Sequence, residues 1–436
     1  MSDLDRAKSA RSRLRTGLAT AATVAGLSAV ALAPGTASAA PSCVGGNIAG
    51  TGSAMQQIAQ QNVWGATFSA EVCNKGSFPK VAYNPSNSAA GMAAWNYDGE
   101  LGEIDNEFAF VGTDMAPTAV QIESIKGVAG GSQLAVIPVV QTSIALVANP
   151  PEGCEIELIT NSQLASVFEG KIYSWHQLEG VEGEAQEKLC EAPITRVVRK
   201  DPSGTSYQFK HYLYQLYKTG LFCTVGEGKA TWQDLEPVSV PATGAPNTTW
   251  PETCAKKALS AVVRPSNGGE DEVVDKINVT AGSIGFAALP EAKANVEGNT
   301  VILRMQNNGQ KKGGEANFAY PDSGSSANCG TQYQVPKINA SLDLDWSQVS
   351  GAKPAIGGEI YPLCMLTYAL AFSDYSSAGF TEAEQITTRD YLYEYVVQAA
   401  GQADTIGTYY APLPFSSEPL FDVIGAARKA AKNISY

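Results

Sequence analysis

The sequence has very little histidine, and its cysteines lack the spacing of metal ligands. His176 and His211 are the only histidines in 436 residues, and neither lies beside a cysteine cluster. None of the eight cysteines belongs to a Cys-x-x-Cys pair. Structural zinc sites and metal-dependent hydrolases draw on such residues at short spacings. We therefore expect no metal, no cofactor and no metal-dependent chemistry.

Basic residues are also scarce relative to acidic ones. The chain has 30 Lys and Arg against 43 Asp and Glu, which gives a formal net charge of -13 at pH 7. An acidic protein is repelled by nucleic acids and by anionic membranes, so we expect neither as a partner. Any bound anion has to be held by local dipoles and by one or two well-placed cations.

Apolar runs long enough to span a bilayer are missing from the sequence. The run "GLATAATVAGLSAVAL" is short, follows a cluster of five basic residues, and precedes the small-residue stretch "PGTASAAP". This order is typical of a secretory signal peptide, and the short apolar run disfavours the alternative, a membrane anchor. We expect residues 1–40 to be removed near Ala39 or Ala40, leaving a secreted protein in the periplasm, the cell wall or the medium.

An even number of cysteines in an exported protein indicates disulfides. Many pairings are possible, and the sequence alone does not decide among them. We favour neighbours in sequence, because each such pair encloses one polar excursion that contains Gly or Pro. The predicted pairs are Cys43–Cys73, Cys154–Cys190, Cys223–Cys254 and Cys329–Cys364.

Short apolar strands alternate with amphipathic helices along the chain, which predicts an α/β protein with mostly parallel strands. No internal repeat is evident, and a mature chain of about 400 residues exceeds one ordinary core, so two lobes are expected. The Gly/Asn/Ser-rich stretch 305–335 indicates an irregular insertion. Predicted strands cover 107–112, 134–140, 143–148, 194–198, 260–264, 283–289 and 366–372, and predicted helices 53–64, 161–171, 204–218 and 271–278.

Three segments share the order strand, Gly/Ser-containing turn, helix. They are "IAGTGSAMQQIAQQ" with Ser53, "VAYNPSNSAAGMAAW" with Ser88, and "VVRKDPSGTSYQF" with Ser203, Gly204 and Thr205. A helix N-terminus offers unpaired amides and about half a positive charge, so each is a natural anion site. The plainer interpretation of each serine is an ordinary N-cap. Three such turns, with Arg199 beside the last, favour a site for a small anion.

A carboxylate lies among these turns. In "FAFVGTDMAP", Asp114 comes just after an apolar strand. It could be a solvated turn residue or a helix cap. If instead it faces an anion, it has to accept a proton carried by that anion, because two bare negative charges repel each other. The ligand would then be an oxyanion that keeps an O–H group.

In their order, these segments resemble the phosphate-binding protein of the bacterial phosphate ABC transporter, in the type II periplasmic-binding-protein superfamily. The matching motifs are "GTGSAMQ" (50–56), "SNSAAG" (86–91), "GTDMAP" (112–117) and "RKDPSGT" (199–205). Further matches are "LITNSQLASVFEGKIYSWHQL" (158–178), "GSIGFAALPEA" (282–292) and "YYAPLP" (409–414). The resemblance spans most of the mature chain apart from the cysteine-flanked excursions and the 305–335 stretch.

The resemblance implies a set of phosphate contacts at the matching positions. Asp114 would be the proton acceptor, and Arg199, held by Asp201, the cation. The remaining ligand contacts would be Ser53, Ala54, Ser88, Ser203, Gly204 and Thr205. The chain departs from the family pattern in Ala54 and Met55, which replace a hydroxyl residue and often Phe. It departs again in "NSAAG", where the family has "GSGAG", and in Pro202, which replaces a glycine. One missing hydrogen bond would cost about 1–2 kcal/mol.

The resemblance therefore implies a two-lobed periplasmic-binding-protein-like fold with a hinge and an interlobe ligand cleft. Lobe 1 would comprise residues 41–140 and 288–436, and lobe 2 residues 141–287, with crossing segments near 138–142 and 287–291. We expect a monomeric, non-enzymatic receptor that captures inorganic phosphate, with the permease of an ABC transporter as its partner.

Three alternatives remain open. The first is a binder of another oxyanion, such as sulfate or molybdate, on the same fold. The second is a secreted phosphohydrolase, which the sequence disfavours because no activated nucleophile with a neighbouring base is evident. The third is an adhesive or matrix component with a vestigial site.

Overall fold

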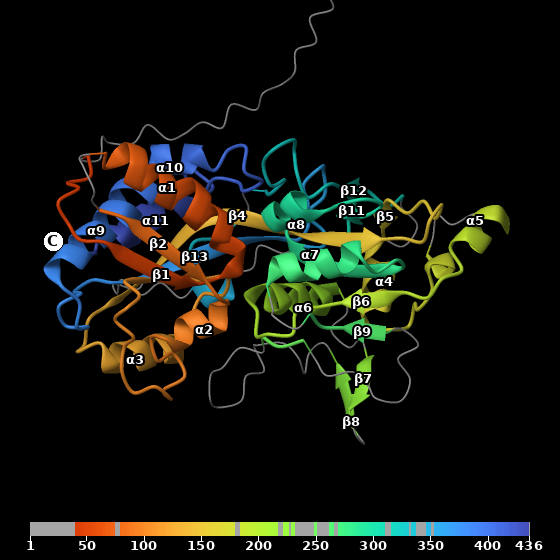
Figure 1. The fold of residues 1–436 in the computed structure, drawn as a ribbon, viewed down its shortest axis with the longest axis horizontal. Coiled ribbons are helices and arrows are strands. Elements are labelled where there is room, and N and C mark those ends of the chain that lie inside the picture. The colour runs from red at the N-terminus through yellow and green to blue at the C-terminus, as the bar shows by residue number, and fades with distance from the viewer. Residues whose placement is uncertain are drawn as a thin grey trace, which may run out of the picture. The chain divides into compact units, whose positions relative to one another are not determined.

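The computed structural model describes most of the chain between residues 40 and 435, including all the segments that match the anion-site motifs (Figure 1). The predicted signal peptide falls almost wholly outside these residues. The described ranges are 40–74, 79–178, 184–216, 221–225, 228–231, 248–250, 261–265, 269–309, 315–330, 333–336, 346–349 and 353–435.

An eleven-stranded sheet organises the described residues, with strand order β2-β1-β3-β13-β4-β10-β6-β9 and β11, β12 and β5 attached beside β4. A separate hairpin pairs β7 with β8. The strands are β1 (Ile48–Gly52), β2 (Val81–Pro85), β3 (Phe110–Thr113), β4 (Leu134–Asn149), β5 (Leu158–Ile159), β6 (Thr195–Val197), β7 (Leu221–Val225), β8 (Gly228–Thr231), β9 (Ala261–Val263), β10 (Ser283–Ala288), β11 (Val301–Gln306), β12 (Phe318–Ala319) and β13 (Cys364–Phe372).

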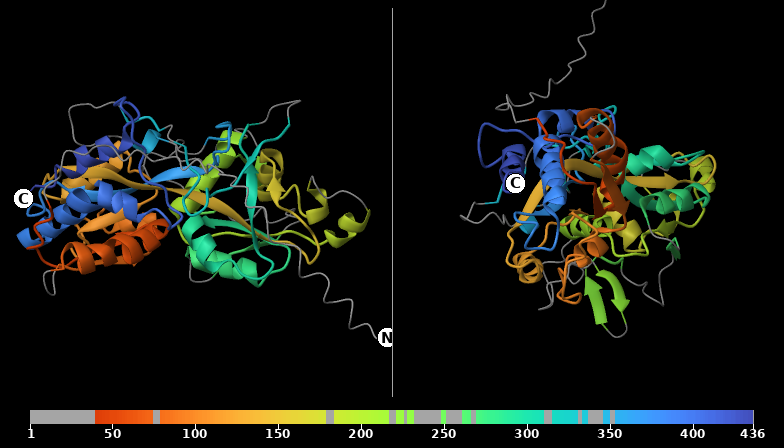
Figure 2. Two further views of the ribbon diagram at one scale, coloured as in Figure 1. Left: turned by 90° about the horizontal axis from the view of Figure 1, so that it is seen from above. Right: turned by 60° about the vertical axis from the view of Figure 1, so that its left-hand side comes forward.

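Strand β4 is a single buried strand of 16 residues, where the sequence predicted two strands separated by Gln141 and Thr142. Its first part pairs antiparallel with β13, and from Ile144 onward it pairs with β10. The register shifts between Thr367 and Tyr368 of β13, where Val139 of β4 is left over beside Pro138, which has no N–H to donate to a ladder. Figures 1 and 2 show β4, in yellow, running from the elements around β1–β3 to those around β6 and β10.

The sheet is mixed, so the expectation of mostly parallel strands was only partly right. The pairs β1–β2, β1–β3, β6–β9 and β6–β10 are parallel. Every strand that pairs directly with β4 or β13 is antiparallel to it. The pair β5–β11 is also parallel. Strands β1, β2, β3 and β6 of the other parallel pairs carry the anion-site motifs at their carboxyl ends, and the antiparallel strands join the two sets.

Helices flank the sheet, and several begin with capping boxes that the sequence makes plain. Thr118 with Gln121, Thr160 with Gln163 and Thr381 with Glu384 bond reciprocally at the starts of α3, α4 and α9. The α-helices are α1 (Gly65–Thr67), α2 (Ser88–Ala93), α3 (Ala119–Val128), α4 (Asn161–Phe168), α5 (Glu184–Leu189), α6 (Gly204–Leu216), α7 (Glu270–Asn278), α8 (Leu289–Asn295), α9 (Glu382–Tyr391), α10 (Ala399–Asp404) and α11 (Val423–Ala431).

Several shorter or wider helical segments complete the described elements. The predicted helix 53–64 begins as a 3-10 turn and widens into a π-helix. These segments are η1 (Ala54–Gln56), η2 (Ala59–Trp64), η3 (Phe68–Val72), η4 (Trp175–Gln177), η7 (Trp346–Gln348) and η8 (Leu392–Val396).

The buried apolar residues form separate clusters on the two parts of β4. The first gathers Leu134–Val140 with the first three strands, most of β13 and the C-terminal helices. The second gathers Ile144, Leu146 and Ala148 with α4, α6 and β10, together with Leu303 and Met305 of β11. A third, smaller cluster lies under α7 and α8. Strand β4 therefore contributes to all three clusters.

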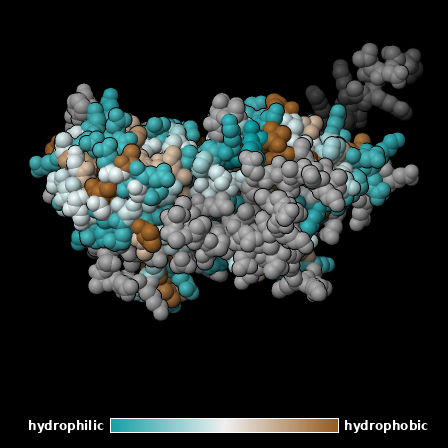
Figure 3. Space-filling view, turned by 90° about the horizontal axis from the view of Figure 1, so that it is seen from below, coloured by the Kyte–Doolittle hydropathy of each residue, from teal (hydrophilic) through white to brown (hydrophobic). Residues whose placement is uncertain are grey.

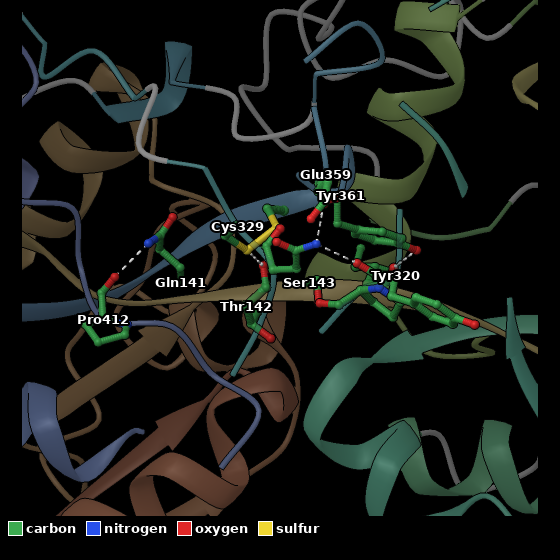
Figure 4. The surroundings of a disulfide bond; sticks show 12 residues. Gln141, Thr142, Ser143, Tyr320, Cys329, Glu359, Tyr361 and Pro412 are labelled. Carbon is green, nitrogen blue, oxygen red and sulfur yellow. Dashed lines mark hydrogen bonds between the residues drawn. A yellow bond between two sulfur atoms is a disulfide. The ribbon is translucent and has the colours of Figure 1, made fainter. Parts of the chain in front are cut away.

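Three of the four expected disulfides are present: Cys43–Cys73, Cys154–Cys190 and Cys329–Cys364. The expected pair Cys223–Cys254 involves Cys254, which lies outside the described residues. Cys329–Cys364 joins the 305–335 stretch to the start of β13, beside Thr142 and Ser143 of β4 (Figure 4). That stretch is less irregular than predicted, since it includes β12 and the end of β11.

Among the described helices, none has the length and apolar character needed to cross a bilayer.

Candidate functional site

The first two predicted turns meet at Asp114, whose side chain is only 2 % exposed. Asp114 directly follows β3. The Ser53 hydroxyl donates a hydrogen bond to its Oδ1, and the Ser88 hydroxyl donates to its Oδ2 over 2.9 Å. Strands β1 and β3 are parallel neighbours with Gly52 opposite Gly112, so their carboxyl ends meet at one edge. The turns therefore bring two hydroxyls to one carboxylate.

The third turn reaches the same carboxylate. A Cβ placed on Gly204, the first residue of α6, would lie 2.7 Å from the Cβ of Asp114 and 2.7 Å from Oγ of Ser88. Only glycine allows so close an approach. The Gln208 side chain, one turn further along α6, donates to the Asp114 carbonyl over 2.7 Å. The start of α6 is thus held directly against Asp114.

Burial raises the pKa of Asp114 from its ordinary value to about 7. The hydrogen bonds from Ser53 and Ser88 and the charge of Arg199 oppose this rise, while the charge of Glu270 adds to it. A carboxyl group with this pKa is present in both protonation states near neutral pH. It can therefore accept a proton from a ligand or give one up at little cost.

Arg199 is buried, and two carboxylates hold it. Its Nε donates to Oδ1 of Asp201 over 2.7 Å, one terminal nitrogen donates to the second Asp201 oxygen, and the other donates to Oε1 of Glu270 over 2.6 Å. Burial opposes the positive charge, but Glu270 and Asp201 outweigh burial and raise the pKa of Arg199. These contacts use three of the five N–H groups of a guanidinium.

Glu270 is a member of this site that the sequence analysis missed. It is the first residue of α7 and is 1 % exposed. Its carboxylate accepts from Arg199, from the Thr205 hydroxyl, and from the Ala288 amide over 3.0 Å. Acidic residues are common in the first turn of helices, where they interact favourably with the helix dipole. The contact with Arg199 spans 71 positions, so no local pattern could have revealed it.

The other predicted residues lie close by, with differing partners. Ser203 caps α6, since its Oγ accepts from the Ser206 amide over 3.3 Å. The Thr205 hydroxyl is engaged by Glu270, where we expected a bond to a ligand. Ala54 is buried at the start of η1, directly after Ser53. All of the predicted ligand-contact residues are buried in this structure.

The arrangement combines donors, a titratable carboxyl group and a helix N-terminus in one buried place. Such a set can bind an oxyanion. It also places a carboxylate of near-neutral pKa beside two serine hydroxyls, a base–nucleophile pair that the sequence analysis did not anticipate. In the described ranges, no three His, Cys, Asp or Glu side chains are placed to hold a metal ion.

The sequence profile of the PBP superfamily domain matches residues 37–385. No curated protein sequence is significantly similar to the chain. Among solved structures, similar folds include a high-affinity periplasmic phosphate-binding protein, PfluDING, with a TM-score of 0.58 and 18 % identity, covering 84 % of this chain and 91 % of that chain. The phosphate-binding protein of Stenotrophomonas maltophilia gives a TM-score of 0.57 and 16 % identity, covering 88 % and 93 %. A human phosphate-binding apolipoprotein gives a TM-score of 0.56 and 18 % identity, covering 84 % and 91 %.

At such low identities the similarity to these structures shows only a shared fold. That fold is the one found in binding proteins. The expected fold class is confirmed. The profile match covers most of the chain, and the chain belongs to the PBP superfamily, with a type II periplasmic-binding-protein fold.

Proposed function

We propose that this protein captures inorganic phosphate at the site built around Asp114. The observation that carries the proposal is one buried carboxylate that accepts from two serine hydroxyls and lies against the glycine that begins α6. Similar folds belong to proteins described as phosphate-binding, which supports the same ligand class.

In the proposed complex, Asp114 accepts the O–H of phosphate, and the hydroxyls of Ser53 and Ser88 turn from Asp114 toward the ligand oxygens. Amides at the start of α6, at Gly204 and Thr205, point toward the anion together with the positive end of the helix dipole. Ala54 and Ser203 complete the proposed contacts. Asp201 and Glu270 position the Arg199 guanidinium, whose two remaining N–H groups reach the phosphate.

The charges of the site determine how the anion is held. Asp201 and Glu270 together outweigh the single positive charge of Arg199. The attraction for an anion therefore comes from oriented N–H and O–H dipoles more than from net charge. Such dipoles act strongly in a buried site because little water screens them. A proton shared between the ligand and Asp114 removes the remaining repulsion between the anion and the Asp114 carboxylate.

We further propose that two lobes close over the phosphate. Lobe 1 would contain residues 41–140 and the C-terminal region, and lobe 2 residues 141–287, with hinges near 138–142 and 287–291. The change of β4 partner from β13 to β10 after Ser143 supports the first hinge. Strand β11 pairs with β4 at Leu146–Ala148, so we place β11 with lobe 2. Ligand contacts from both lobes would drive the closure.

In the cell we propose an exported, monomeric receptor that delivers phosphate to the permease of an ABC transporter. The disulfides support a location outside the cytoplasm. Among the described residues on the face shown in Figure 3, apolar ones form small separate areas among hydrophilic ones, which supports a monomer. The net charge of -13 supports a partner that is not a nucleic acid.

Calorimetric titration of the mature protein with phosphate, sulfate and nucleotide monophosphates tests the ligand. Phosphate keeps at least one O–H at neutral pH, whereas sulfate has none and would oppose the Asp114 carboxylate with bare oxygens. We expect sulfate to bind about four orders of magnitude more weakly than phosphate. Asp114→Asn, whose amide can also donate, should lose phosphate affinity and gain measurable sulfate binding. Equal binding of the two anions by the wild-type protein would refute the phosphate assignment.

The contact between Ser53 and Asp114 also raises the alternative of a phosphohydrolase. We propose that the protein is not an enzyme, because each carboxylate oxygen of Asp114 already accepts from a serine hydroxyl and because similar folds belong to phosphate-binding proteins. Incubation with p-nitrophenyl phosphate at pH 6, 7 and 8 tests this. We expect no release of nitrophenol above that given by Ser53→Ala. Turnover that Ser53→Ala abolishes would establish the enzymatic alternative.

A further inference from the structure

A third buried carboxyl group, in addition to those of Asp114 and Glu270, lies close to this site, and none of the contacts above involves it. Glu291 is the third residue of α8, the short helix that follows β10, and its side chain is 4 % exposed. Neither of its carboxyl oxygens has a hydrogen-bond partner among the described residues. In contrast, all four carboxyl oxygens of Asp114 and Glu270 accept hydrogen bonds.

Two contacts place neighbours of Glu291 beside the anion site. The amide of Ala288, the N-cap of its own helix, donates to Glu270, which in turn holds Arg199. On another side, the Tyr410 hydroxyl donates over 2.7 Å to the carbonyl of Met55, the residue after Ala54. The charge of Glu291 contributes to the raised pKa of Tyr410. The start of α8, which carries Glu291, thus lies against Glu270, and the Glu291 carboxyl is near enough to Tyr410 for its charge to act there.

The surroundings of Glu291 favour the neutral form of its carboxyl group. Burial raises its pKa well above the ordinary value, and the charges of Glu270, Asp114 and Asp271 raise it further, while its own backbone amide opposes the rise. On its own helix, Lys293 pairs with Asp322. A neutral carboxylic acid has one O–H to donate as well as an accepting oxygen.

A buried polar group without a partner costs stability, typically about 1–3 kcal/mol. Native proteins keep few such groups, and they deserve an explanation. Here the explanation lies in the ligand. An oxyanion bound among Asp114, Ser53 and the start of α6 would bring acceptor oxygens to this buried region.

We propose that Glu291 is a specificity-determining residue of the anion site, a neutral carboxylic acid that donates its O–H to an oxygen of the bound phosphate. The inference rests on the proposed function. Glu291 supplies a donor without adding a positive charge. The donor is present while Glu291 stays protonated, and is lost as the pH rises through its raised pKa, so that the ionised group then repels the anion.

Two variants separate this role from a merely structural one. Glu291→Gln keeps an uncharged donor of nearly the same shape, and Glu291→Leu removes the donor while filling the space. We expect Glu291→Gln to bind phosphate within about threefold of wild type at pH 7. Glu291→Leu should bind at least tenfold more weakly, the loss expected for a hydrogen bond to a charged ligand. Its thermal stability without ligand should be unchanged or higher, because an unpaired polar group has been removed.

The matched control is Glu297→Gln, which makes the same chemical change at an exposed position just after α8. It should leave phosphate affinity unchanged.

An infrared difference spectrum gives a second readout that needs no Leu variant. On addition of phosphate, the carbonyl band of a protonated carboxyl should shift in the wild-type protein, and this component should be missing in Glu291→Gln.

The possible outcomes distinguish the two proposals. If the wild-type protein does not bind phosphate, the proposed function fails first, and this inference with it. If the wild-type protein binds phosphate, and Glu291→Leu binds it equally well or the infrared band of Glu291 does not respond, only the role of Glu291 is overturned.

Discussion

Arg199 and Glu270 form a buried ion pair, with 2.6 Å between a terminal guanidinium nitrogen and Oε1, although 71 positions separate them in sequence. Through this pair the start of α7 is fixed to the turn that precedes α6. The same Glu270 oxygen also accepts from Thr205, the second residue of α6. The cation of the site is therefore positioned by a carboxylate from another helix as well as by its near neighbour Asp201.

We predict that Arg199→Ala weakens phosphate binding by about 2–4 kcal/mol, because a buried cation and its charge-assisted hydrogen bonds are lost. Lys200→Ala is the matched control, since it removes the same charge at the next, exposed position. Calorimetric titration of both variants measures the difference. Wild-type affinity in Arg199→Ala would place the anion elsewhere and leave the turn as an ordinary capped helix start.

The raised pKa of Asp114 predicts a pH dependence of stability in the absence of ligand. In the unfolded chain Asp114 loses its proton near its ordinary pKa, whereas in the folded protein it keeps the proton until about pH 7. Between these pH values the free energy of the unfolded state therefore falls relative to that of the folded state as the pH rises. The wild-type free energy of unfolding should fall by about 4 kcal/mol relative to Asp114→Asn between pH 4 and pH 8, with little further change above.

Urea denaturation of both proteins at several pH values measures this difference. Other titrating groups are common to the two proteins and cancel in the comparison. A constant difference from pH 4 to pH 8 would mean that the Asp114 carboxyl titrates at its ordinary pKa, and that it is better solvated than the structure indicates.

Gly204→Ala should damage the site by steric means alone. The added methyl group would lie 2.7 Å from both the Asp114 Cβ and the Ser88 Oγ, so the start of α6 would have to move. We expect a loss of about 1–3 kcal/mol in stability and at least a tenfold loss of phosphate affinity. Gly127→Ala in α3 is the control, because no atom lies within 4 Å of an added Cβ there. Unchanged binding by Gly204→Ala would show that α6 does not close on the ligand.

For the remaining cysteines we predict the bond Cys223–Cys254. Three of the predicted pairs are present in the structure, and these two are the cysteines left over. Peptide mapping without reduction should recover a peptide that links them. A disulfide that closes a loop of this kind adds roughly 3 kcal/mol to the free energy of unfolding, because it restricts the unfolded chain. A free thiol at either position, or a mixed pairing with another cysteine, would contradict the prediction.

Local sequence was enough to find the parts of the site that lie at strand ends and helix starts. Ser53, Ser88, Asp114 and Gly204 each follow a strand or begin a helix, and parallel neighbours bring such positions together. Glu270 and Glu291 could not be found in this way. Acidic residues near a helix start are common, and only the fold decides whether they face water or a buried arginine.

The fold class was predictable for similar reasons, while the course of the strands was not. The polar residues Gln141 to Ser143 interrupt the apolar run, so the sequence suggested a break there. In the structure this run stays in the strand, and two of its three side chains bond to distant segments. The Gln141 amide donates to the Pro412 carbonyl (Figure 4). The Ser143 hydroxyl donates to the Pro321 carbonyl.

The course of strand β4 also affects how the protein unfolds. Because it contributes side chains to every one of the apolar clusters, no cluster can lose its order without exposing part of a strand that the others need. Unfolding should be cooperative over the whole of the strand. The slowest-exchanging amides should lie along its length, and a ligand that stabilises one end should slow exchange at the other.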